Sequence, residues 1–178
     1  NDEFAYRPYC VIVINNEFIV SDCENNRLQF FDIETFDFVK SIDTRVFNLY
    51  NPTHLCFNSS LNLLYVTGRN SHKIYVLDAK DNSYIHSFGE FGVGNGDLEF
   101  IRGICVSDDG RFIVVSEWQN NRIQILHAVD GTFIVSYGSQ EYRNVYLDNI
   151  VITHGSNQLS FPNGICLTNK NDLLVCNS

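Results

Sequence analysis

The feature that most constrains the fold is a segment that occurs three times along the chain. In each copy a hydrophobic strand runs into a polar corner, and a second strand follows a basic residue; the copies are 19–32, 65–78 and 114–127. The corner residue and the base are always five positions apart, as in Asp22 and Arg27, Gly68 and Lys73, and Glu117 and Arg122. A repeat kept in phase predicts stacked similar units, which usually work as a surface.

The residues before each corner repeat as well, so the unit is longer than the corner. A cysteine in a short apolar run lies twelve positions before each corner residue, at Cys10, Cys56 and Cys105, and Cys166 begins a fourth copy. A turn follows each run, and further apolar stretches at 38–42, 84–88 and 133–137 supply a fourth strand. The sequence therefore predicts an all-β fold, an incomplete β-propeller of four-stranded antiparallel blades, with three full blades and the first hairpin of a fourth.

The motifs of these repeats resemble the NHL family. The pattern P-x-G-I, then I-x-V-x-D, then N-N-R-I-Q, then F-G is best matched by residues 103–125. The resemblance implies that residues 1–178 are one NHL-type propeller segment. Approximate blades fall at 4–48, 49–97 and 98–140, followed by an insertion at 141–156 and a partial blade at 157–178. Because a propeller ring has about four to eight blades, we expect the chain to be a fragment of a longer protein.

A glycine-rich stretch at 89–96 reads at first like a phosphate-binding loop. No Lys-Ser or Lys-Thr pair follows it and no helix is expected behind it. It resembles instead the F-G-x-x-G-x-G link between NHL blades, in which glycine permits the turns.

One edge of each predicted blade gathers the candidate binding residues. Arg7, Thr53, Arg102 and Asn163 stand three positions before the cysteines. In an antiparallel hairpin the start of one strand lies beside the end of the next, so these residues should share a face with the corner residues. Arginine occurs where the corner holds an acid, which predicts ion pairs of Arg7 with Asp22 and of Arg102 with Glu117. Alternatively, this polar edge receives a peptide or a small ligand.

Two residues just after the corners complete the candidate set. Trp118 follows the corner of the third copy, where Arg69 stands in the second. An exposed tryptophan on a rigid loop is a good interface anchor, although it could equally pack against a neighbouring blade. The predicted binding residues are therefore Arg7, Asp22, Arg69, Arg102, Glu117, Trp118 and Asn163.

An enzymatic alternative rests on residues 160–167, which resemble the Pro-Asn-Gly strand of gluconolactonase-like and strictosidine-synthase-like propellers. By that resemblance Asn163 would bind a divalent cation. A calcium-type site needs several converging oxygen ligands, whereas the matching positions hold Arg7, Thr53 and Arg102. Peptide-amidating lyases, another NHL-type propeller, use histidine-bound metal, but no histidine pair here has ligand spacing. We expect no metal and no cofactor, and keep a metal-dependent hydrolase or lyase as the alternative.

The charge of the chain indicates the class of binding partner, and its cysteines indicate the redox compartment. The chain has 12 basic and 21 acidic residues, a net charge of −9, and its bases are spread one or two per repeat. Nucleic-acid binding needs clustered bases, so the partner should be a protein or a peptide. The four repeated cysteines are too far apart for disulfides, which fits a reducing, cytoplasmic setting. No apolar stretch approaches the ~18 residues of a membrane span.

These observations predict a non-catalytic protein-interaction module. In the NHL family such propellers often form the substrate-recognition part of a larger protein, including tripartite-motif ubiquitin ligases. That resemblance implies an adaptor role for this chain. The ubiquitin chemistry would require a RING domain outside these residues.

Overall fold

The computed structural model describes residues 8–138, 145–147, 150–152, 159–168 and 172–176. In those residues the secondary structure is β-sheet with two short 3-10 helices, η1 (Cys23–Asn25) and η2 (Thr44–Phe47). The chain divides into two compact units, Asn1–Ser87 and Phe88–Ser178. Each unit is described by itself below.

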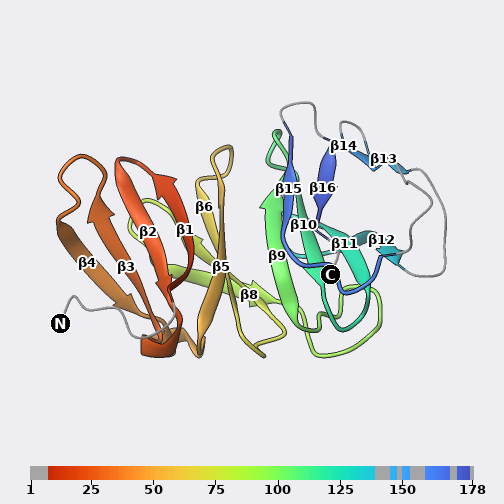
Figure 1. The fold of residues 1–178 in the computed structure, drawn as a ribbon, viewed down its shortest axis with the longest axis horizontal. Helices are drawn as coiled ribbons and strands as arrows, with labels where there is room; N and C mark the ends of the chain where they lie inside the picture. The colour runs from red at the N-terminus through yellow and green to blue at the C-terminus, as the bar shows by residue number, and fades with distance from the viewer. Residues whose placement is uncertain (1–7, 139–144, 148–149, 153–158, 169–171, 177–178) are drawn as a thin grey trace. The chain divides into compact units, whose positions relative to one another are not determined.

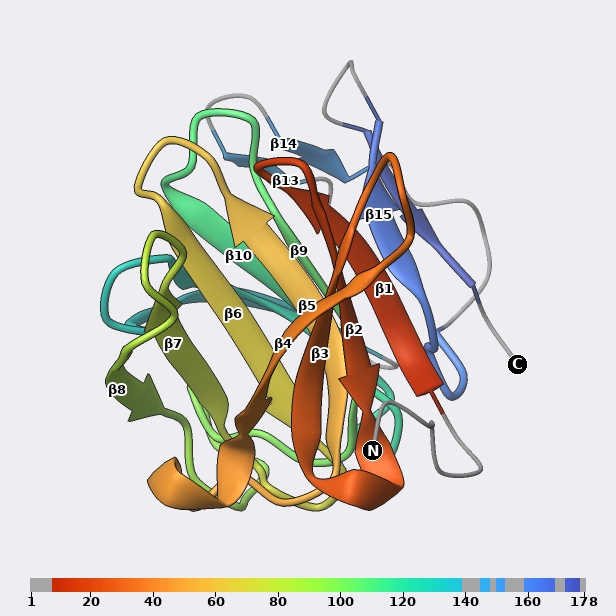
Figure 2. The same cartoon turned by 90° about the vertical axis from the view of Figure 1, so that its left-hand side faces the viewer.

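The first unit contains two four-stranded antiparallel sheets, which we call blade 1 and blade 2 (Figure 1). Blade 1 consists of β1 (Pro8–Ile14), β2 (Glu17–Asp22), β3 (Arg27–Asp32) and β4 (Phe38–Asp43). Blade 2 consists of β5 (Pro52–Asn58), β6 (Leu63–Gly68), β7 (Ile74–Asp78) and β8 (Tyr84–Phe88), whose last residue begins the second unit. Figure 2 views this unit with blade 1 in front of blade 2.

The second unit contains blade 3 and two short hairpins. Blade 3 consists of β9 (Ile101–Val106), β10 (Phe112–Glu117), β11 (Arg122–His127) and β12 (Phe133–Gly138). The hairpins are β13 (Val145–Leu147) with β14 (Ile150–Ile152), and β15 (Ile165–Leu167) with β16 (Leu173–Val175). The first hairpin lies in the predicted insertion, and the second is the expected start of a fourth blade. The predicted all-β architecture of an incomplete propeller with four-stranded blades is confirmed.

Asparagine-rich turns set the strand spacing. Asn15 and Asn16 both have positive φ, 47° and 67°, and close the two-residue turn between β1 and β2, as expected of a type I′ hairpin. The residue before the base of each corner is also left-handed: Asn26, His72 and Asn121 have φ of 55°, 53° and 49°. Asparagine tolerates this conformation better than most residues, which explains the N-N that precedes the base in two copies.

Adjacent blades pack through opposite faces of their sheets. In the first unit Ile19, Leu28 and Phe30 of blade 1 belong to one buried cluster with Leu64 and Val66 of blade 2. We call the face of each blade that carries Ile19 or its equivalents the A face, and the face that carries Leu64 or its equivalents the B face. In the second unit the A face of blade 3 packs against the β15–β16 hairpin through the side chains Val114, Ile123, Ile125, Ile165, Leu167, Leu173 and Val175.

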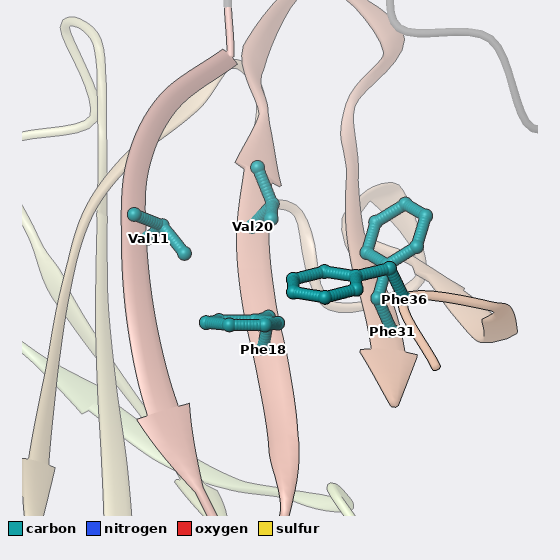
Figure 3. A pocket seen from close by; sticks show the side chains of 5 residues that line it. All are labelled: Val11, Phe18, Val20, Phe31 and Phe36. Atoms are coloured by element: carbon teal, nitrogen blue, oxygen red, sulfur yellow. The ribbon is translucent and has the colours of Figure 1, made fainter. Parts of the chain in front are cut away.

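The B face of blade 1 carries a shallow apolar pocket of about 190 Å³ (Figure 3). Its lining residues are Val11, Phe18, Val20, Phe31 and Phe36. Val11 is 58% exposed and Phe36 is 69% exposed. The equivalents of Phe18, Val20 and Phe31 in blade 2 are Leu64, Val66 and Leu77, all fully buried. The pocket is therefore an uncovered blade-stacking face, and its chemistry is that of an inter-blade core and not of a ligand site.

Matched substitutions at Val20 and Val66 test this interpretation. Val66→Lys should lower the free energy of unfolding by more than about 3 kcal/mol, because it buries an unpaired charge against blade 1. Val20→Lys should cost less than about 1 kcal/mol, because its ammonium can reach water. Urea unfolding followed by circular dichroism measures both values. Equal losses would show that the B face of blade 1 is covered in solution.

Candidate functional site

The predicted shared edge of each blade is present. Pro8 pairs with Asp22, Pro52 with Gly68 and Ile101 with Glu117, so the first strand of each blade starts beside the end of its second strand. We call this edge, together with the corner that follows it, the rim edge. Among the predicted site residues, Arg7 lies outside the described part of the chain, and the other six lie on rim edges.

The rim edge of blade 1 is held by a buried carboxylate. The Asp22 side chain is fully buried, and its Oδ2 accepts hydrogen bonds from Arg27 Nε at 2.7 Å and Gln29 Nε2 at 2.8 Å. Asn25 Nδ2 donates to the same oxygen at 2.9 Å. A buried charge needs such pairing to offset its lost hydration. The five-residue step in the sequence is therefore the spacing of an ion pair.

Blade 3 repeats the network with a longer acid. Glu117 is fully buried and accepts from Arg122 Nε at 2.6 Å, Gln124 Nε2 at 2.8 Å and Asn120 Nδ2 at 2.9 Å. The predicted pair of Arg102 with Glu117 is wrong. Arg122 stands directly opposite Glu117 in the antiparallel pair of β10 and β11, where cross-strand side chains meet. In the pairing of β9 with β10, a register shift between Ser116 and Glu117 puts Ile101, and not Arg102, opposite Glu117.

The same network clamps the glycine-rich link that precedes blade 3. The Arg122 guanidinium donates to the carbonyls of Val93, Gly94 and Asp97 at 2.7, 3.0 and 2.8 Å. The backbone N–H groups of Gly96 and Glu99 donate in turn to Gln124 Oε1 and Glu117 Oε1 at 3.0 and 2.8 Å. Glu117, Arg122 and Gln124 thus fasten the link to blade 3, so both carboxylate oxygens of Glu117 accept from internal donors.

Blade 2 lacks this network. Gly68, Lys73 and Tyr75 replace the acid, the arginine and the glutamine. A Cβ atom on Gly68 would collide with Leu49 Cδ1, because the fully buried Leu49 fills the space that an acid would need. The Tyr75 hydroxyl donates to Asn48 O at 3.1 Å, and burial raises the pKa of this phenol. In blade 2 the apolar side chain of Leu49 and the hydroxyl of Tyr75 therefore take the place of the polar network.

A polar pocket lies beside Tyr75, and we call it the blade 2 corner pocket. Its volume is about 260 Å³, and it is lined by Asn48, Tyr50, Arg69, Asn70, Ser71, Lys73 and Tyr75. Arg69 is one of the predicted site residues, and its Nη1 lies 3.7 Å from Glu24 Oε1. Both side chains of that pair are more than a third exposed, so the pair contributes little. The lining holds two bases and no acid.

The rim edge of the second unit carries an aromatic cluster made of Arg102, Trp118 and Phe161. The Trp118 and Phe161 rings lie 4.7 Å apart, and the Arg102 guanidinium carbon lies 5.9 Å from the tryptophan ring. Trp118 is half-buried and Phe161 is 40% exposed. Phe161 was not among the predicted residues. Its position just before the Pro-Asn-Gly strand start was the available signal, but nothing in the sequence pairs it with Trp118.

Asn163 lies on the same rim edge and acts through its backbone. Its carbonyl accepts from Ser116 Oγ, and its N–H donates to Cys176 O at 2.8 Å. The equivalent contact in the first unit runs from Ser21 Oγ to Thr53 O at 2.6 Å. The two serine bonds join one blade to the start of the next, whereas the bond from Asn163 to Cys176 lies within the partial blade. The predicted positions Thr53 and Asn163 therefore link neighbouring blades.

The surroundings of Asn163 do not fit a bound dication. No group of three histidine, cysteine, aspartate or glutamate side chains converges anywhere in the described residues. The nearby rim cluster contributes a guanidinium and two aromatic rings, whereas a calcium-type site needs several oxygen ligands.

All six cysteines are free thiols, and burial raises the pKa of Cys10. In the described residues, no helix is long and apolar enough to cross a membrane.

Comparison with solved structures shows a β-propeller fold. Hydrazine synthase from Kuenenia stuttgartiensis is 17% identical over 92% of this chain and 40% of its own, with a TM-score of 0.65. The RRP9 WD40 repeats are 11% identical over 75% of this chain and 39% of theirs, with a TM-score of 0.60. A chain of a mitotic checkpoint complex is 14% identical over 94% and 43%, with a TM-score of 0.64.

The chain therefore spans about two fifths of the length of each of these structures. At such low identity the likeness concerns the fold alone. No model of a known protein family matches the sequence, and no curated protein matches it either.

Removing the base from the corner of blade 3 and of blade 2 tests the structural role of the network. Arg122→Met should lower the free energy of unfolding by about 3 kcal/mol, because it leaves the buried Glu117 uncompensated. Lys73→Met should cost less than about 0.5 kcal/mol, because its corner has no acid. Urea unfolding measures both. Similar values for the two variants would contradict the network's role, and Arg122→Met with Glu117→Gln should recover part of the loss.

Proposed function

We propose that residues 1–178 form one NHL-type propeller segment that binds a protein partner at a rim edge. The proposed blades are 4–48, 49–97 and 98–140, with an insertion at 141–156 and a partial blade at 157–178. Support comes from the N-N-R-x-Q motif, because its arginine and glutamine build the same buried network in blades 1 and 3. In this proposal the module is not catalytic and needs no cofactor.

The observation that carries the binding role is the aromatic cluster of Arg102, Trp118 and Phe161. Tryptophan and arginine are the residues most enriched among interface hot spots. Here the tryptophan ring contacts a phenylalanine ring and a guanidinium, which limits the side-chain entropy that it loses on binding. A partly exposed and pre-ordered aromatic group on a rim is suited to anchor a protein or peptide.

The partner's charge follows from that of the chain. With a net charge of −9, the module should attract a protein of basic or mixed character and repel nucleic acid. The six free thiols favour a reducing compartment such as the cytoplasm. As part of a larger protein, the module would serve as a substrate-recognition unit, for example of a tripartite-motif-like ubiquitin ligase.

Substitution of the cluster tests this function. The chain and its variants are used as baits in a cell extract, and recovered proteins are quantified by mass spectrometry. Trp118→Ala and Arg102→Glu should each lower recovery of the specific partner at least about tenfold, the loss expected of a hot spot. Thermal melts should show both variants folded.

Two control variants change the opposite end of blade 3. Val129→Ala alters an apolar residue that is 60% exposed. Arg111→Glu reverses a charge whose side chain is 52% exposed. Both should recover the partner as the unaltered chain does. If the cluster variants recover the same proteins in the same amounts as the controls, the proposed binding role is wrong.

A further inference from the structure

The repeated corners provide an internal reference for the basic residue of each blade. In blades 1 and 3 the arginine lies against a fully buried acid at 2.7 and 2.6 Å, and its own side chain is only 18% and 11% exposed. Both charges are therefore neutralised within the blade. Neither Arg27 nor Arg122 presents a full positive charge to a partner.

Blade 2 has a base at the equivalent position, Lys73, but no acid. Gly68 has no side chain, and Leu49 fills the place where a carboxylate would sit. Lys73 is exposed and lines the blade 2 corner pocket together with Arg69. Glu24, the partner of Arg69, lies 3.7 Å away in an exposed pair, which an incoming anion can displace at little cost. The pocket therefore concentrates two positive charges on an otherwise acidic chain.

The other lining groups suit a small oxyanion. The volume of about 260 Å³ is several times the roughly 30 Å³ that one water occupies, so a carboxylate or phosphate group can enter. Asn48, Asn70 and Tyr50 add amide and hydroxyl groups to the lining. Hydrogen bonds from charged donors to such anions are the stronger kind in proteins.

The net charge of −9 limits which anions can approach the blade 2 corner pocket. An extended polyanion would meet repulsion from the rest of the chain, whereas a single anionic side chain on a peptide meets only the local pair of bases. We propose that the blade 2 corner pocket binds one oxyanionic side chain of a peptide, through Arg69 and Lys73. This inference rests on the proposed function, because it names a second contact of the same protein partner.

Three labelled peptides test the pocket on the full chain. Each is a ten-residue glycine-serine peptide with one central phosphoserine, glutamate or glutamine, and binding is measured by fluorescence anisotropy. The phosphoserine or the glutamate peptide should bind, and the ratio of their affinities shows whether phosphate or carboxylate is preferred. The glutamine peptide should bind at least about tenfold more weakly, because it lacks the charge.

Variants of the two bases tie the binding to the pocket. Lys73→Gln and Arg69→Gln should each weaken the better anionic peptide about tenfold, the loss of one charged hydrogen bond. Lys80→Gln is the matched control, since Lys80 is an exposed base of the same blade that follows the end of β7 opposite the pocket. The control should bind as the unaltered chain does. Lys73→Glu should abolish anionic binding.

Failure of this inference is distinguishable from failure of the proposed function. Equal binding of all three peptides, or of the Lys73→Gln and Lys80→Gln variants, overturns the oxyanion pocket. In that case Trp118→Ala can still abolish recovery of the protein partner, which leaves the rim function intact. Conversely, Trp118→Ala should leave peptide binding unchanged, because Trp118 does not line the pocket.

Discussion

A buried carboxylate bound to an arginine and a glutamine is the interaction on which the rim of these blades depends. In blade 3 it fixes the end of β10, the corner and the glycine-rich link through donors on both sides of the acid. Each polar group in such a network is costly when left alone and favourable when fully partnered. Blades 1 and 3 therefore carry acid, base and amide together, and Trp118 of the aromatic cluster directly follows the acid of blade 3.

Blade 2 reaches the same backbone by another route. Leu49 replaces the acid's volume and Tyr75 replaces the glutamine, with its hydroxyl on the carbonyl of Asn48. The apolar substitution removes the need to bury a charge, which is often neutral for stability. It also leaves Lys73 without a counter-ion among the residues that the structure describes, so the corner of blade 2 holds a base that is not paired as Arg27 and Arg122 are.

The sequence was sufficient to predict the blades, because strand alternation, turn residues and the repeat phase agree at every copy. The fourth strand beginning at Phe38 and the partial hairpin beginning at Ile165 both occur where expected. Side-chain pairing was harder to foresee. The predicted pair of Arg102 with Glu117 rested on hairpin geometry and on arginine occurring where the corner holds an acid. The register shift instead puts Ile101 of β9 opposite Glu117, and Arg122 of β11 binds the acid. The roles of Leu49 and Phe161 depend on contacts with residues distant in sequence, Gly68 and Trp118, which the repeat pattern does not reveal.

Two buried oxygen atoms on the B face of blade 1 differ from their counterparts in blade 3. Among the described residues, Asp22 Oδ1 and Gln29 Oε1 are buried without hydrogen-bond partners, whereas their counterparts in blade 3 take the N–H groups of Glu99 and Gly96. These atoms lie on the same side of the sheet as the apolar pocket of Val11, Phe18 and Val20. A polypeptide segment packed on that side can cover the apolar side chains and also donate to these two acceptors, as the link before blade 3 does for Glu117 and Gln124.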